Sequence, residues 1–378
     1  MRRYSAILLV FWGSLSLGAC GPSGGDDSDG SVNRRDGSTS KDASGLSDGF
    51  VWPDARPTDA MLGCDPRSFQ LQQAPPAEVY LVVDRSGSML EPGATPGLTR
   101  WEELTLAVDA ALSQYHRVIK FGLLTYPKDN ECTTPGPQVG LALDNQIAIM
   151  SHLTTAVPAG GTPTAAALNN ASSSMLALGD PTSPKYIILA TDGGPNCNYF
   201  LSASPTCSCT YASPEWCCTS HPASCLFGYT CLDDQRTLDI VEELHQNQSI
   251  DTFVIGLDGT DEYTDLLDEL ALAGGRPQTG GTKYYYPASN QADLLAALQT
   301  IAVGLISCQI DLGEAPDFPD LVRIYMDGGE VPMDPASQNG WNYTDASNTT
   351  IELFGEPCET LQNGDPHNLT ATFACVVN

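Results

Sequence analysis

The sequence predicts an α/β protein with a doubly wound, mostly parallel sheet, followed by a small all-β unit at the C-terminal end. Apolar runs alternate with segments of helical periodicity throughout residues 77–307, which is typical of a parallel sheet covered by helices. The runs lack polar alternation, as expected of strands buried on both faces. From residue 308 onward, short β-type runs are separated by Gly, Pro, Asn and Asp.

The first half of the alternation starts with the strand Val79–Val83, which gives way to polar residues at Asp84. A helix follows, because Thr99 and Glu102 form a capping box ahead of apolar residues at helical spacing. The next expected elements are a strand over 118–126, a short edge strand over 138–143, a helix over 144–157, and a helix capped by Thr162 with Pro163 at its first position.

The second half starts with a strand over 185–191, which breaks at Asp192 as the first strand breaks at Asp84. A cysteine-rich segment separates it from the remaining helices (238–245, 266–272, 294–307) and strands (251–257, 283–287). Residues 308–378 contain the β-type runs 308–312, 321–326, 349–354 and 369–377. These runs predict either a separate domain or strands packed on the first one.

The N-terminal residues indicate export. Residues 1–19 combine two arginines, an apolar stretch and small residues, and their end before Cys20 resembles the lipobox of bacterial lipoproteins. The resemblance implies that Cys20 is acylated and anchors the chain in the bacterial cell envelope, in the outer membrane or at the cell surface. Residues 20–60 are rich in Gly, Ser and Asp and are expected to form a flexible tether. An ordinary signal peptide cleaved near Cys20 is the alternative.

The charge of the chain restricts its partners. The formal net charge is -29, so nucleic acid and anionic lipid headgroups are poor partners, while cations are attracted. We therefore expect no nucleic-acid binding and contact with a membrane only through the lipid anchor.

Polar side chains gather where the predicted strands end. Asp84, Ser86 and Ser88 follow the first strand, and Asp192 follows the strand over 185–191. Because ligands of parallel sheets bind beyond the carboxyl ends of the strands, and the loop of Thr162 must approach the same end, we expect these side chains to converge. Their oxygen atoms are hard ligands that suit a small divalent cation. Taken alone, residues 84–88 also fit an ordinary turn.

Together, DRSGS at 84–88, GGTP at 160–163 and TDG at 191–193 resemble the von Willebrand factor type A (vWA) domain and its metal-ion-dependent adhesion site. The resemblance covers residues 77–307 and implies a Rossmann-like domain, which we assign to 61–307 with a cysteine-rich insert at 195–233. It implies that Ser86, Ser88 and Thr162 bind Mg²⁺ or Mn²⁺ through their hydroxyls, directly or through water. Asp84 and Asp192 are then expected to act mostly through waters, and a partner protein to supply an Asp or Glu carboxylate.

Thirteen cysteines in an exported chain predict disulfides, and twelve remain if Cys20 is acylated. Seven lie between 197 and 231, so one must pair outside the insert, and we predict the pair Cys132–Cys197. A Cys64–Cys308 bridge would close a loop around the α/β domain and hold its last helix. Cys358–Cys375 is the third expected pair. A zinc site in the insert is the alternative to its disulfides.

The sequence thus predicts an envelope-anchored binding or adhesion protein without catalysis. One alternative is a scaffold subunit of an envelope complex, which would use the same site. A hydrolase with Ser86 as nucleophile is the other alternative, and it needs a base within hydrogen-bond reach. Among the five histidines only His221, in the insert, is a candidate for that base.

Overall fold

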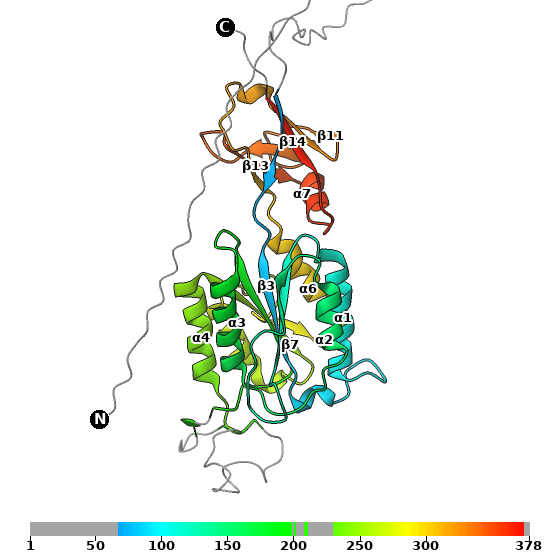
Figure 1. Cartoon of the computed structure of the whole chain (residues 1–378), viewed down its shortest axis with the longest axis vertical. Coiled ribbons are helices and arrows are strands. Elements are labelled where there is room, and N and C mark those ends of the chain that lie inside the picture. The colour runs from blue at the N-terminus through cyan, green and yellow to red at the C-terminus, as the bar shows by residue number, and fades with distance from the viewer. Residues whose placement is uncertain (1–66, 199, 202–207, 211–229, 374–378) are drawn as a thin grey trace, which may run out of the picture. The chain divides into compact units, whose positions relative to one another are not determined.

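The computed structural model describes residues 67–198, 200–201, 208–210 and 230–373 (Figure 1). Its largest sheet has six strands in the order β5-β4-β3-β6-β7-β8. All neighbouring strands are parallel except β5, which pairs with β4 in the antiparallel direction at one edge. The strands are β3 (Glu78–Asp84), β4 (Lys120–Tyr126), β5 (Val139–Ala142), β6 (Lys185–Thr191), β7 (Ile250–Leu257) and β8 (Tyr286–Ala288). The mostly parallel sheet predicted from the apolar runs is confirmed.

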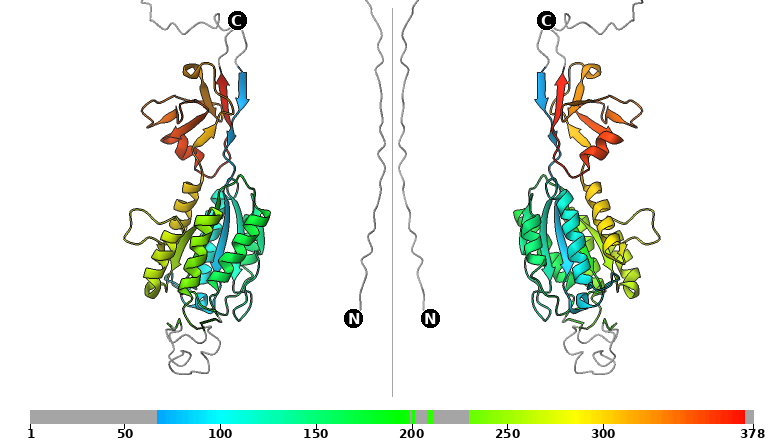
Figure 2. Two further views of the ribbon diagram at one scale, coloured as in Figure 1. Left: turned by 90° about the vertical axis from the view of Figure 1, so that its left-hand side faces the viewer. Right: turned by 90° about the vertical axis from the view of Figure 1, so that its right-hand side faces the viewer.

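Helices cover both faces of this sheet (Figures 1 and 2). One core contains the side chains of α1, α2 and α6 together with Val79, Leu81 and Val83, and the other contains those of α3, α4 and α5 together with Tyr80 and Val82. Alternate residues of β3 therefore enter different cores, and this is why the strand carries no charged residue between Glu78 and Asp84. The helices are α1 (Arg100–Tyr115), α2 (Gln146–Leu153), α3 (Thr164–Leu178), α4 (Asp234–Gln248), α5 (Thr264–Ala273) and α6 (Gln291–Leu305), with short 3-10 turns at Gly87–Leu90 and Asp261–Tyr263.

The two predicted helix starts had different outcomes. The capping box of α1 is confirmed, with the Thr99 side chain accepting from the Glu102 N–H and the Glu102 carboxylate accepting from the Thr99 N–H. The predicted start of α3 was wrong, because the helix begins at Thr164 with Pro163 in the N-cap position and has no side-chain cap. The Thr162 hydroxyl is thus not used to cap the helix.

The C-terminal strands form a unit with its own core. Two antiparallel four-stranded sheets, β1-β14-β10-β11 and β12-β13-β9-β2, share buried apolar side chains that include Trp341 and Ile351. The elements are β1 (Arg67–Gln70), β2 (Gln72–Gln73), β9 (Gln309–Asp311), β10 (Arg323–Met326), β11 (Gly329–Val331), β12 (Gly340–Tyr343), β13 (Thr350–Phe354), α7 (Glu356–Leu361) and β14 (Leu369–Phe373), with a 3-10 turn at Pro319–Leu321. The four predicted β-type runs contain β9, β10, β13 and β14.

Residues 67–73 belong to the β unit, whereas the predicted domain boundaries placed them in the α/β domain of 61–307. In the structure β1 pairs with β14 and β2 pairs with β9. Leu71 is buried in the β-unit core, and the ring of Phe69 contacts that of Phe373. Over the described residues the chain therefore passes from the β unit into the α/β domain and back, so the boundary of 308–378 omits the two strands β1 and β2.

A disulfide in the β unit corrects two of the predicted pairs. Cys308 is bonded to Cys358, so the predicted pairs Cys64–Cys308 and Cys358–Cys375 are both wrong. The physical reason is the packing of the unit: the Leu353 N–H donates to the Cys308 carbonyl at 2.9 Å, which sets Cys308 beside the end of β13, just ahead of α7. Cys64 and Cys375 lie outside the described residues, as do the signal sequence, Cys20, the tether and His221. No helix in the described ranges combines the length and the hydrophobicity needed to span a bilayer.

Candidate functional site

Three strands of the parallel sheet end at the site. Asp84 is the last residue of β3, beside Tyr126 at the end of β4, and Thr191 is the last residue of β6. Asp192 follows directly, so the two aspartates predicted from sequence reach the same edge of the sheet. Both are buried, with 0% of Asp84 and 2% of Asp192 exposed.

Hydrogen bonds connect four of the five predicted residues. Asp84 Oδ1 accepts from the Ser86 N–H at 2.8 Å. The hydroxyls of Ser86 and Ser88 are 3.0 Å apart, and Ser88 Oγ donates to Asp192 Oδ1 at 2.9 Å. On the other side, Thr191 Oγ1 donates to Asp84 Oδ2 at 2.6 Å. Asp84, Ser86, Ser88 and Asp192 thus form one continuous polar cluster at the sheet edge.

Thr162 lies in a neighbouring loop that contacts the β3 loop through its backbone. The Gly87 N–H donates to the Gly160 carbonyl at 3.1 Å, and the Ala159 N–H donates to the Arg85 carbonyl at 2.8 Å. Thr162 is 5% exposed, and its N–H donates to Asn196 Oδ1 at 2.7 Å. Within the described ranges its hydroxyl makes no hydrogen bond to the four other residues.

Burial dominates the electrostatics of the two aspartates. Burial, and then the charge of Asp192, raises the pKa of Asp84 to about 7. Burial also raises the pKa of Asp192, while hydrogen bonds from Arg100 and Ser88 oppose this shift. Because two buried carboxylates are close together, the protonated form of Asp84 persists to near-neutral pH unless more positive charge is present.

Arg100 is a residue of the site that the sequence reasoning missed. Its Nη1 lies 3.0 Å from Asp192 Oδ2, and its Nη2 lies 3.2 Å from a carboxylate oxygen of Glu91. The Nε, 3.8 Å from Asp258 Oδ2, has no hydrogen-bond partner although it is buried. The sequence feature that could have indicated Arg100 is its position in the first turn of α1. A positive charge there is unfavourable with respect to the helix dipole, so a nearby carboxylate was to be expected.

The donor set suits a hard cation. It consists of carboxylate and hydroxyl oxygens only, the ligands that Mg²⁺ and Mn²⁺ take from proteins. No cluster of three or more His, Cys, Asp or Glu side chains able to hold a metal occurs among the described residues. Cation binding here would therefore depend on the serine and threonine hydroxyls as much as on the two carboxylates.

The hydrolase alternative requires a base hydrogen-bonded to Ser86, and no histidine in the described part of the chain is in that position. His152 is hydrogen-bonded near the carboxyl end of β4, with its Nε2 2.9 Å from Thr125 Oγ1, whereas His245 is bonded to Asp251 at the opposite end of β7. No hydrogen bond joins it, or another histidine of the described ranges, to Ser86 or Ser88. Burial lowers the pKa of His152, and the charge of Arg85 lowers it further.

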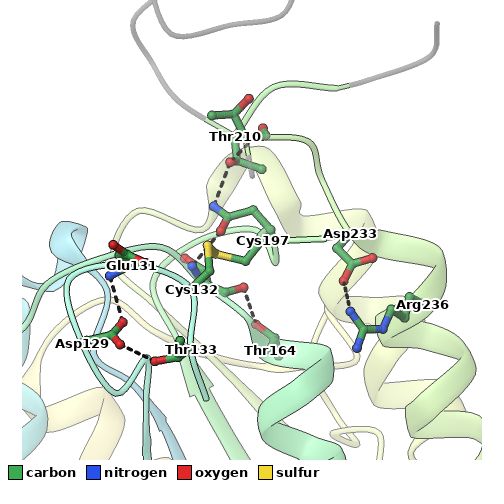
Figure 3. Close-up of a disulfide and its surroundings, with 12 residues drawn as sticks. Asp129, Glu131, Cys132, Thr133, Thr164, Cys197, Thr210, Asp233 and Arg236 are labelled. Atoms are coloured by element: carbon green, nitrogen blue, oxygen red, sulfur yellow. Dashed lines mark hydrogen bonds and ion pairs between the residues drawn. A yellow bond between two sulfur atoms is a disulfide. The ribbon is translucent and has the colours of Figure 1, made fainter. Parts of the chain in front are cut away.

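The disulfide predicted between the loop after β4 and the insert is confirmed. Cys132 is bonded to Cys197, five residues after Asp192 (Figure 3). Cys209 and Cys231, the other two insert cysteines that the structure describes, are also disulfide-bonded. These three cysteines are therefore not zinc ligands.

Comparison with known proteins gives the same assignment for the central part of the chain. Residues 79–195 match the family model of the von Willebrand factor type A domain. A search of curated proteins finds no match to this chain.

Three solved structures illustrate what this chain is similar to. The pilus adhesin SpaC from Lactobacillus rhamnosus GG is 16% identical, with a TM-score of 0.46 over 80% of this chain and 40% of that one. Manganese-loaded TRAP protein from Plasmodium vivax is 20% identical, with a TM-score of 0.40 over 62% of this chain and 76% of that one.

The vWF domain of the type V pili tip protein Mfa5 from Porphyromonas gingivalis is 16% identical, with a TM-score of 0.43 over 63% of this chain and 97% of that one. The present chain spans less than half the length of SpaC. The matched residues 79–195 and the mostly parallel six-stranded sheet with helices on both faces together show that this chain has the von Willebrand factor type A fold.

Proposed function

We propose that this chain is a cell-envelope protein that binds another protein through a divalent cation, Mg²⁺ or Mn²⁺, and performs no catalysis. In this proposal Ser86, Ser88 and Thr162 provide hydroxyl ligands, and Asp84 and Asp192 orient them and balance the charge. When bound, the cation supplies a positive centre with an open position for a carboxylate of the partner.

The observation that carries the proposal is the hydrogen-bonded cluster of two buried aspartates and two serines at one sheet edge. Burying two carboxylates is costly unless positive charge compensates them. Arg100 provides one charge, to Asp192, and no cationic side chain in the described ranges pairs with Asp84. A cation between the serines would compensate Asp84.

Isothermal titration with Mg²⁺ and Mn²⁺ tests the cation. We expect one ion to bind to the parent protein and no measurable binding to the Ser86→Ala, Asp192→Ala double variant. The matched control is the Asp345→Ala, Ser347→Ala double variant, which removes a similar hydrogen-bonded pair from an exposed loop of the β unit. Binding that is unchanged in the first variant would contradict the proposed site.

The partner and the anchor need separate tests. If a partner carboxylate binds to the cation, a captured partner should be released by a chelator and should not be retained by the double variant. Fatty-acid labelling of the parent, compared with a Cys20→Ser variant, tests the lipid anchor. A protein that stays in its complex in the presence of the chelator would favour the scaffold alternative.

A further inference from the structure

The loop that carries Thr162 is held by two other loops. On one side, the Gly161 N–H donates to the Glu131 carbonyl at 2.9 Å. On the other, Asn196 bonds both backbone groups of Thr162: its N–H donates to the Thr162 carbonyl at 2.8 Å, and its Oδ1 accepts from the Thr162 N–H at 2.7 Å. The position of Thr162 therefore depends on segments that start about 30 residues away in both directions.

The contact with the loop after β4 is tight enough to require glycine. Gly160 has a φ of +85°, and a Cβ at this position would lie 2.6 Å from the Glu131 carbonyl oxygen and 2.8 Å from that of Asp129. The shape of this loop is itself fixed, because the Asp129 carboxylate accepts from the Glu131 N–H and from the Thr133 hydroxyl (Figure 3). A shaped loop thus lies directly against Gly160.

The Cys132–Cys197 disulfide joins the two holding loops where they meet the Thr162 loop. A Cβ on Gly161 would lie 2.5 Å from Cys197 Sγ and 3.4 Å from Cys132 Sγ, so the sulfur atoms contact this glycine. Cys197 has a φ of +69°, a left-handed conformation that is unfavourable for a residue with a Cβ and persists only where its surroundings fix it. The preceding residue, Asn196, is fixed as well, because its Nδ2 donates to Thr210 Oγ1 at 2.9 Å.

We propose that the Cys132–Cys197 disulfide and Asn196 are positioning residues that hold Thr162 in place for cation binding. The inference rests on the proposed function, because it assigns a role in that site to residues that do not bind the ion. Thr162 is the one expected ligand whose hydroxyl is not bonded to the aspartate and serine cluster, so its position is set by the backbone contacts of its loop. Residues that orient metal ligands typically contribute about 10-fold to 100-fold to metal affinity.

The test compares two double variants, each lacking one disulfide. Cys132→Ser, Cys197→Ser removes the bridge beside Thr162, and the matched control Cys308→Ser, Cys358→Ser removes the bridge of the β unit. Isothermal titration should show Mg²⁺ affinity at least about 10-fold weaker in the first variant and within about 2-fold of the parent in the second. Equal affinity of the first variant and the parent would overturn the inference.

Amide hydrogen exchange of the metal-free proteins provides a readout that does not depend on the ion. In the first variant the amides of Gly161 and Thr162 should exchange faster than in the parent, while that of Val82 in β3 is unchanged. Unchanged exchange at Gly161 and Thr162 would refute the positioning role even if affinity fell. If the parent binds neither Mg²⁺ nor Mn²⁺, the proposed function fails, and the exchange result still decides whether the disulfide positions the loop.

A single substitution provides the same test if the cysteine variant does not fold. Asn196→Ala leaves the disulfide intact and removes the side-chain acceptor of the Thr162 N–H. It should raise exchange at Thr162 and weaken Mg²⁺ binding by about 10-fold or more. A variant with parent-like exchange and affinity would overturn the role assigned to Asn196.

Discussion

Replacing Asp84 with asparagine should change how the stability of the metal-free protein depends on pH. Asp84 is fully buried, and its pKa is raised from 3.8 to about 7 by burial and by Asp192. The folded protein therefore keeps a proton that the unfolded chain has released above pH 3.8. The resulting stability is fully present below the unfolded pKa and is lost as pH rises through about 7.

The magnitude follows from the two pKa values. The difference between 3.8 and about 7 corresponds to about 4 kcal/mol of unfolding free energy over the whole range, and to about 2 to 3 kcal/mol between pH 5 and pH 8. The D84N side chain does not titrate. Its amide oxygen can still accept from the Ser86 N–H, and the Thr191 hydroxyl can accept from its amide N–H.

Urea denaturation in a chelator at pH 5 and pH 8 provides the assay. The parent should lose about 2 to 3 kcal/mol more unfolding free energy than D84N over this interval. The control is D334N: hydrogen bonds from backbone N–H groups lower the pKa of the partly exposed Asp334, so its titration lies below this window and D334N should follow the parent. A D84N protein with the same pH dependence as the parent would refute the assigned protonation of Asp84.

Three further outcomes are expected. Titration at several pH values should show Mg²⁺ affinity falling by up to about tenfold per pH unit below 7, because protons and the cation compete for Asp84. A Mg²⁺ affinity that does not change between pH 5 and pH 8 would count against this competition. In urea denaturation at pH 8 without metal, R100Q should lose about 3 to 5 kcal/mol of unfolding free energy, because it leaves the buried carboxylate of Asp192 unpaired. The control R323Q breaks an exposed ion pair and should lose less than about 1 kcal/mol. Similar losses in the two variants would contradict the burial argument. G160A should be destabilised by more than about 1 kcal/mol, because position 160 has a positive φ and two backbone carbonyls lie against it. The control G136A, with nothing within 4 Å of its Cβ and no positive φ, should be as stable as the parent. Equal stability of G160A and the parent would show that the loop can relax.

Much of the fold was predictable because its signals are local. The apolar run of β3, the helical spacing of α1 and the capping box at Thr99 each depend on residues within a few positions of one another. The expectation that Asp84 and Asp192 meet follows equally simply, because parallel strands place their carboxyl ends at one edge.

Other features required the tertiary structure because they depend on contacts between residues far apart in the chain. The pairing of β1 with β14 joins segments about 300 residues apart, and no local pattern in residues 67–73 distinguishes the β unit from the α/β domain. The correct partner of Cys308 is Cys358, which only the packing of α7 after β13 brings within reach.

The features of the candidate site also separate into those that the sequence determined and those that only the tertiary structure decided. Sequence alone determined which oxygen-bearing side chains lie at the end of each strand, because strand termination and turn chemistry are properties of short segments. Only the tertiary structure decided what surrounds them. The ion pair of Arg100 with Asp192 spans 92 positions, and the bond of Asn196 to Thr162 spans 34. The partners of Arg100 and Thr162 are fixed by how the loops pack together at the sheet edge. That packing depends on the folding of the whole domain.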